Sequence, residues 1–137
     1  MIPPFDEFGL PPPGVHPATL DEIDARFGQQ SELRRVQMDS VRWMVDLAAK
    51  AGAERIVLNG SFVTDIIEPN DVDCVILFQR GAKKDRAAFQ ELRAGLPFLD
   101  IAIATPKRFE QYVSRIYAAD RHGLPKGMAE VIHDVTK

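Results

Sequence analysis

Two apolar segments decide the fold of this chain, IVLNGS at residues 56–61 and NDVDCVILF at residues 70–78. Short runs of β-branched and other apolar residues are typical of buried strands. The loop of residues 61–70 is too short for a helical crossover, so we expect the second strand, 72–79, to run antiparallel to the first. Because both faces of the second strand are apolar, we also expect layers of structure on both sides of the sheet.

The segments that follow continue the pattern of a small mixed β-sheet flanked by helices. A helix over residues 83–95, with Phe89 and Leu92 buried, is long enough to carry the chain to a third strand at 98–104, parallel to the second. Pro106 suits the first turn of a further helix. Apolar residues at helical spacing follow it: Phe109, Tyr112, Val113, Ile116 and Tyr117. Residues 128–132 are expected to form a short edge strand.

The first fifty residues add a proline-rich arm and two helices. Six prolines within residues 1–18 favour an extended arm rather than a strand, and its apolar residues predict that the arm lies against the domain. Thr19 and Glu22 match a capping box for a short helix that ends near Gly28. A longer amphipathic helix begins at Ser31 and ends near Gly52. Its expected buried stripe is Val36, Val41, Met44, Val45 and Ala48, widened by Trp43 and Leu47.

The composition is that of an ordinary globular domain. The chain has 137 residues, of which 45% are hydrophobic and 27% are charged, and its net charge is -3. We expect an arm at 1–18 and a single α+β domain at 19–137 with its core at 54–118. The charge gives no support to a general nucleic-acid surface, although an RNA acceptor stays open. A secretory signal and a membrane-spanning run are not recognisable, so a cytoplasmic location is expected.

The single cysteine and the histidines carry little functional signal. Cys74 cannot form an intramolecular disulfide, and its apolar neighbours indicate a buried thiol rather than a nucleophile. The histidines show no metal-ligand spacing and are interpreted as surface or turn residues: His16, His122 and His133.

Three aspartates are expected to converge at one end of the sheet. Asp71 and Asp73 are two positions apart and project to the same side, and Asp100 enters the third strand near the same end. Two carboxylates about 4 Å apart repel by roughly 4 kcal/mol at an effective dielectric constant near 20. Mg²⁺ takes hard oxygen ligands and offsets such repulsion, and two ions could brace the attacking and leaving oxygens of a nucleotidyl transfer.

Gly60 and Ser61 lie at the expected end of the first strand and are suited to phosphate. Glycine lets the backbone turn sharply beside a ligand, while backbone N–H groups and the Ser61 hydroxyl can hold phosphate oxygens, especially if residues 61–65 begin a helical turn. The sequence is not a Walker A loop, because no Gly-Lys-Ser/Thr occurs. Each motif also has a structural alternative, since Asn70-Asp71 after Pro69 suits a turn and an aspartate at the entrance of a strand is common. Asp100 within an apolar strand favours the functional interpretation.

The order of these motifs, from the strand and Gly60-Ser61 to Asp71-Val72-Asp73 and Asp100, resembles the nucleotidyltransferase fold of the DNA polymerase beta superfamily. In size the chain is similar to its minimal members, and the resemblance covers residues 55–104. It implies that Asp71, Asp73 and Asp100 bind two Mg²⁺ ions, that Asp100 is also the general base, and that Gly60 and Ser61 hold a nucleoside triphosphate. The segment LPPPGVHPAT at residues 10–19 also resembles the opening of small bacterial proteins of this fold.

The chain departs from this pattern after Gly60-Ser61. Minimal members often carry an arginine and a second glycine there, whereas this chain has FVTD at residues 62–65, and Asp65 adds negative charge near the expected triphosphate. Basic residues that could offset phosphate charge are Arg80, Arg121 and Lys126.

Two functions follow from the resemblance. The first is transfer of a nucleoside monophosphate from a triphosphate to a hydroxyl of a protein, an RNA or a small molecule. The alternative is an antitoxin-like protein that binds a toxin with weak or no catalysis, and that uses the arm and residues 19–52 as its docking surface.

Overall fold

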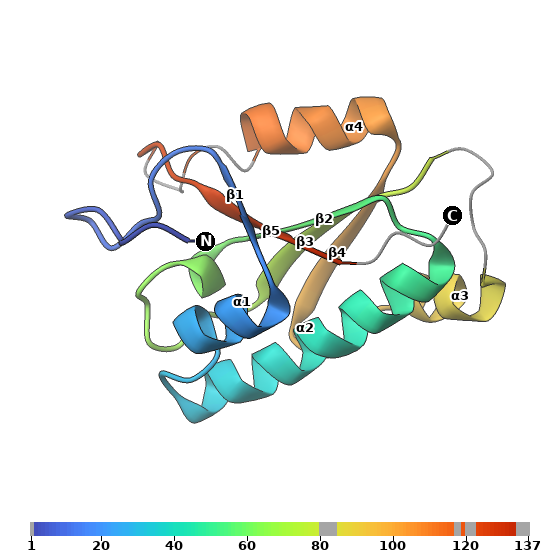
Figure 1. Ribbon diagram of the computed structural model, residues 1–137, viewed down its shortest axis with the longest axis horizontal. Helices are drawn as coiled ribbons and strands as arrows, with labels where there is room; N and C mark the ends of the chain where they lie inside the picture. The colour runs from blue at the N-terminus through green and yellow to red at the C-terminus, as the bar shows by residue number, and fades with distance from the viewer. Residues whose placement is uncertain (1, 80–84, 117–118, 120–122, 134–137) are drawn as a thin grey trace.

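A five-stranded mixed sheet organises the chain in the computed structural model, which describes residues 2–79, 85–116, 119 and 123–133 (Figure 1). The strand order is β1-β5-β2-β3-β4. The strands are β1 (Val15–Ala18), β2 (Arg55–Asn59), β3 (Val72–Leu77), β4 (Leu99–Ala104) and β5 (Met128–Val131). β2 is antiparallel to both β3 and β5, while β3 and β4 are parallel. The predicted directions of β2, β3 and β4 are therefore confirmed.

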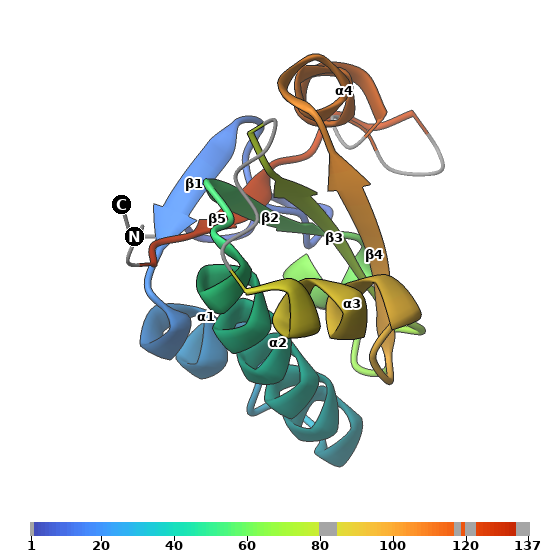
Figure 2. The ribbon, with the colours of Figure 1, turned by 90° about the vertical axis from the view of Figure 1, so that its right-hand side faces the viewer.

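Helices cover both faces of the sheet, as the apolar faces of β3 predict (Figures 1 and 2). One face carries the helices α1 (Leu20–Phe27), α2 (Glu32–Ala51) and α3 (Arg86–Ala94). The other face carries α4 (Pro106–Gln111), which continues as a π-helical turn, Tyr112–Ile116. Along β3, Cys74 packs with the first group of helices, whereas Val75 packs with Phe109 of α4. The mixed α/β class is confirmed.

The ends of α1 and α2 follow the capping signals in the sequence. Thr19 and Glu22 form both hydrogen bonds of the capping box, each 3.1 Å long. Ser31 accepts a hydrogen bond from the backbone of Arg34 at the start of α2. Gly52 ends α2 in the left-handed conformation with φ 90°. These local signals explain why the predicted helix bounds are close to those observed.

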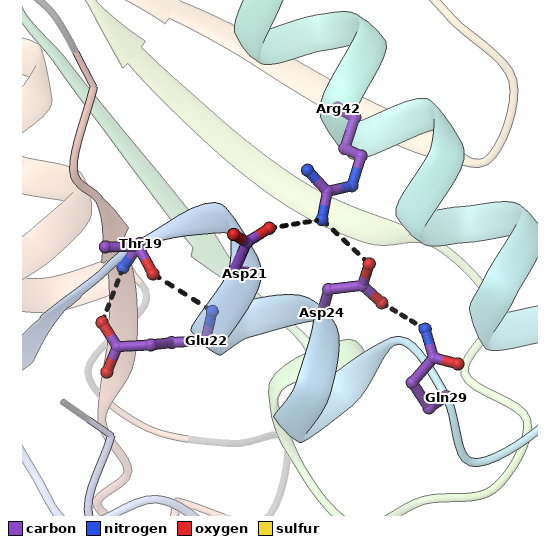
Figure 3. A network of polar contacts seen from close by, with 6 residues as sticks. All are labelled: Thr19, Asp21, Glu22, Asp24, Gln29 and Arg42. Carbon is purple, nitrogen blue, oxygen red and sulfur yellow. Dashed lines mark hydrogen bonds and ion pairs between the residues drawn. The ribbon is translucent and has the colours of Figure 1, made fainter.

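A polar network ties α1 to α2 (Figure 3). The guanidinium of Arg42 in α2 donates to Asp21 at 3.1 Å and to Asp24 at 2.9 Å. Gln29 also donates to Asp24, and the hydrogen bond from Arg42 lowers the pKa of the Asp24 carboxyl. Because Asp21 is largely exposed, its ion pair with Arg42 contributes little to the stability of the fold.

The proline-rich arm contains a strand, contrary to the prediction. β1 pairs in parallel with β5 from Val15 opposite Met128 to Ala18 opposite Val131. A strand at the edge of a sheet needs partners on one side alone, which is why Pro17 is tolerated within β1. The prediction for β5 was also wrong, because this strand lies between β1 and β2 rather than at an edge.

The arm lies against the rest of the molecule, as predicted. Ile2 and Leu10 are buried, and the Phe5 ring packs on Phe27 of α1 with 6.0 Å between centroids. Phe8 is exposed instead.

Other predicted side-chain positions need correction. Val36 is 40% exposed and Trp43 is 46% exposed, so the buried stripe of α2 is narrower than expected. In α3, Leu92 is buried but Phe89 is half-buried. Residues 83–84 and Tyr117, which were expected in helices, lie outside the described residues.

Candidate functional site

Four polar residues, three from neighbouring strands and one from the segment before β5, lie in a line at one end of the sheet. Asn59, the last residue of β2, is paired in register with Asp73 of β3, and Asp73 is paired with Asp100 of β4. On the other side, the ammonium of Lys126, two residues before β5, donates to the side-chain oxygen of Asn59. We call Lys126, Asn59, Asp73 and Asp100 the polar row. Paired residues of adjacent strands project to the same face, so these side chains share one face of the sheet.

The polar row lies on the same face of the sheet as α4, which covers this face farther along β3. Asp73 and Val75 are two positions apart on β3 and therefore point to the same side, and Val75 packs with Phe109 of α4. Asp73 and Asp100 stand near the starts of their parallel strands, beyond this apolar contact. The parallel register of β3 and β4 explains why two residues so distant in sequence become neighbours.

Gly60 and Ser61 adjoin the row directly. Gly60 has φ 84° and ψ -169°, a conformation essentially restricted to glycine. A Cβ atom at this position would stand 2.7 Å from the Asp73 carboxylate. The chain then makes a short 3₁₀ helix, Ser61–Val63, so the helical turn expected after Gly60 is present. The structure therefore brings Gly60 and Ser61 next to Asp73.

The three aspartates interact electrostatically. Burial raises the pKa of Asp73, and the negative charges of Asp100 and Asp71 raise it further, while the charge of Lys126 acts in the opposite direction. Asp73 is half-buried, whereas Asp71 and Asp100 are exposed. Across the described residues, no group of three or more His, Cys, Asp and Glu side chains is preformed as a metal centre. The acids gather at one end of the sheet without the tight clustering of a preformed centre.

A buried arginine in α2 fixes the turn that follows Gly60. Arg34 is 1% exposed, and its guanidinium donates to the carbonyl oxygens of Phe62 at 2.6 Å and Thr64 at 2.8 Å. It also donates to Ile66 at 2.9 Å, and it reaches Phe27 at the end of α1 at 2.9 Å. Burial lowers the pKa of Arg34, and backbone carbonyl oxygens rather than a carboxylate accept the hydrogen bonds of its guanidinium. α2 thereby sets the conformation of residues 61–66.

Gln37, one turn farther along α2, holds the other end of the same loop. Its side-chain nitrogen donates to the carbonyl oxygens of Pro69 at 2.8 Å and Asn70 at 3.3 Å, just before Asp71. Arg34 and Gln37 together anchor both ends of the connection between β2 and β3. The position of Asp71 and the Gly60-Ser61 turn thus depends on one helix.

Asp65 lies against the arm. Its backbone N–H donates to the carbonyl of Gly9 at 3.1 Å, and a Cβ atom on Gly9 would meet the Asp65 carboxylate at 2.2 Å. The charge of Asp65 also acts on Arg34, whose pKa it raises against the effect of burial. The negative charge of Asp65 is therefore partly offset by the buried guanidinium of Arg34.

Asn59, Arg34 and Gln37 were not predicted as part of the site. A signal for the two α2 residues was present, because Arg34 and Gln37 precede the buried Val41 by seven and four positions and so belong to the buried stripe. A polar residue at a buried position requires partners. Lys126 was predicted among the basic residues and lies in the row, whereas Arg80 and Arg121 are outside the described residues.

Cys74 and two histidines have structural surroundings. Cys74 is fully buried, as predicted, and burial raises the pKa of its thiol. His16 lies within β1 rather than in a turn and contacts the carbonyl of Pro12 at 2.7 Å. His133 is half-buried and contacts the carbonyl of Ala53 at 3.0 Å, while His122 is not among the described residues.

Comparisons with known proteins give a family but no activity. Neither the curated proteins nor the solved structures include a significant match. Across the described part of the chain, none of the helices has the length and apolar character needed to cross a membrane. A family model described as "Family of unknown function (DUF6932)" matches residues 3–132. Because this match spans nearly the whole sequence, the chain belongs to the DUF6932 family.

Proposed function

We propose that the protein is a Mg²⁺-dependent nucleotidyltransferase with the nucleotidyltransferase fold. The observation that carries this proposal is the register of Asp73 opposite Asp100 on parallel strands, directly beside the Gly60-Ser61 turn. The sequence pattern of the DNA polymerase beta superfamily requires that these two aspartates be neighbours, and the expected crossover helix before the strand of Asp100 predicts the same arrangement. A mixed sheet with helices on both faces is consistent with that fold.

The donor set fits a divalent cation. The carboxylates of Asp71, Asp73 and Asp100 are hard oxygen ligands of the kind that Mg²⁺ takes, and the like charges that raise the pKa of Asp73 would be offset by a bound cation. In this proposal Asp71 and Asp73 hold the metal, and Asp100 is a ligand from the neighbouring strand. Bound Mg²⁺ supplies charge neutralisation for the phosphate oxygens.

The residues of the chain then divide the reaction between them. The Gly60-Ser61 turn holds the triphosphate through backbone N–H groups and the Ser61 hydroxyl. An acceptor hydroxyl attacks the α-phosphorus, its proton passes to the Asp100 carboxylate, and the bond to the β-phosphate oxygen breaks to release pyrophosphate. Asp100 is exposed, so an acceptor can approach it from solvent. Arg34 and Gln37 keep the turn and Asp71 in place.

Transfer of radioactive label tests the proposal. The protein is incubated with Mg²⁺, each of the four α-³²P-labelled ribonucleoside triphosphates, and protein, RNA and small hydroxyl acceptors. We expect labelling by the wild type and by Asp39→Asn, an exposed control on α2, and a loss of at least about 100-fold in the Asp71→Ala/Asp73→Ala variant. Equal labelling by the double variant, or no labelling by the wild type with any acceptor, contradicts the proposal.

One surface feature favours the second candidate, an antitoxin-like protein that binds a toxin. Val36 and Trp43 are seven positions apart on α2, which places them on one side of the helix, and both are substantially exposed. Tryptophan is enriched among the anchor residues of protein interfaces. Under this hypothesis the product of an adjacent gene co-purifies with the wild type and is lost with Trp43→Glu, while Asp71→Ala/Asp73→Ala keeps it.

A further inference from the structure

We infer that Lys126 binds the β- and γ-phosphates of the triphosphate, and that the proline-rich arm exists to hold this lysine in the polar row. The inference rests on the proposed function and names the cation that recognises its substrate. It also gives a role to the sequence LPPPGVHPAT at residues 10–19, which the metal site alone does not explain.

The position of Lys126 follows from the sheet. β5 lies beside β2, with Ala129 opposite Leu58. Lys126 precedes this pairing, its side chain is 4% exposed, and its ammonium donates to the Asn59 side-chain oxygen. Asn59 immediately precedes Gly60 in the chain. Lys126 is therefore at the end of the polar row beside Asn59, the residue that leads into the Gly60-Ser61 turn, and Asp100 is at the other end.

The arm grips the backbone next to this lysine. The N–H of Gly127 donates to the carbonyl of Pro11 at 2.9 Å, and the N–H of Met128 donates to Gly14 at 2.9 Å. A Cβ atom on Gly127 would stand 2.0 Å from the Pro12 carbonyl oxygen. Because the contact leaves no space for a side chain at Gly127, the arm and the Lys126-Gly127 segment cannot shift independently. We call this contact the arm clasp.

Charge explains why the row needs a cation at this end. A nucleoside triphosphate brings several negative charges to a site that already holds Asp71, Asp73 and Asp100. Lys126 acts electrostatically on Asp73, so its charge is felt across the row. An ammonium withdrawn from water attracts phosphate more strongly than an exposed one does. In the proposed reaction Asp100 faces the acceptor hydroxyl. Lys126, at the other end of the row, would then face the β- and γ-phosphates, which leave as pyrophosphate.

Binding of Mg²⁺-pyrophosphate and Mg²⁺-ATP, measured by isothermal titration calorimetry, tests this assignment. Lys126→Gln keeps a donor for Asn59 but removes the charge, and we expect both affinities to fall by about 10- to 100-fold. Lys126→Arg keeps the charge and should retain most of the binding. Lys50→Met, on α2 at the opposite face of the sheet, removes an exposed lysine and should bind as the wild type does.

The arm clasp is tested separately by Gly127→Ala. We expect this variant to stay folded by circular dichroism but to bind both ligands more weakly, because the added Cβ atom displaces the lysine or the arm. Wild-type affinity in Lys126→Gln overturns the assignment and leaves the proposed function standing. Absence of binding and of transfer in the wild type overturns both.

Discussion

Replacement of Arg34 by methionine is the most direct test of how α2 supports the site. The side chain is almost fully buried and donates to the carbonyls of Phe27, Phe62, Thr64 and Ile66. Methionine replaces the aliphatic part of the arginine side chain and fits an irregular apolar space, but it cannot donate a hydrogen bond. The substitution therefore removes the guanidinium and its hydrogen bonds while an unbranched apolar side chain stays in the helix.

The expected cost follows from these partners. The bonds to Phe27, Phe62 and Thr64 are buried, and each such carbonyl left without its donor costs about 1–2 kcal/mol. Ser61 loses little, because its carbonyl also accepts from the Thr64 hydroxyl at 2.7 Å. Removal of a desolvated charge offsets part of the loss. We expect the free energy of unfolding to fall by about 3–4 kcal/mol, a large part of the stability of a typical domain.

Equilibrium unfolding in urea, followed by far-ultraviolet circular dichroism, measures this change. Arg35→Met is the matched control, because the adjacent Arg35 is exposed and makes a single 3.3 Å bond to the carbonyl of Gln29. The control should change stability by less than about 0.5 kcal/mol. If Arg34→Met costs less than about 1 kcal/mol, the guanidinium does not hold the loop and the argument from its hydrogen bonds is refuted.

Three further outcomes are expected. In Gly60→Ala the free energy of unfolding, measured in urea, should fall by about 1–3 kcal/mol, because alanine rarely adopts φ 84° and its Cβ atom would meet Asp73. An unchanged unfolding midpoint would contradict this prediction. The pKa of Asp73 is raised in the folded state, so ionisation of Asp73 destabilises the metal-free protein. At pH 7 in EDTA, Asp73→Asn should therefore melt at a higher temperature than the wild type. This difference should narrow as the pH falls toward 3.8, the ordinary pKa of an aspartate. The opposite trend would mean that Lys126 dominates. Cys74 should react with Ellman's reagent in urea but not in the native protein, since the thiol is fully buried.

The strands β2, β3 and β4 and the first two helices could be predicted because their signals are local. Apolar runs mark β2, β3 and β4, and the capping residues Thr19 and Ser31 mark the starts of α1 and α2. The neighbourhood of Asp73 and Asp100 followed from the crossover helix, since a helical connection favours parallel strands. These features depend on residues close together in the sequence.

The missed features depend on distant partners. β1 was rejected for its prolines, although pairing with β5 supplies hydrogen bonds to one side of it. Trp43 was assigned to the core because helical spacing gives a direction around the axis but not the width of the covered surface. Arg34 was overlooked because its partners are backbone carbonyls of a loop, and a sequence does not record where those carbonyls point.

The place of β5 inside the sheet has a consequence for how the protein comes to be folded. β5 follows every other strand in the chain, yet it alone joins β1 to β2. During synthesis, β1 and one edge of β2 therefore have no strand to pair with until β5 has been made. Closing a connection of nearly the full chain length is entropically costly, so we expect this step to limit the folding rate. Lys126 belongs to the same segment, so we expect the polar row to be completed only at this late step.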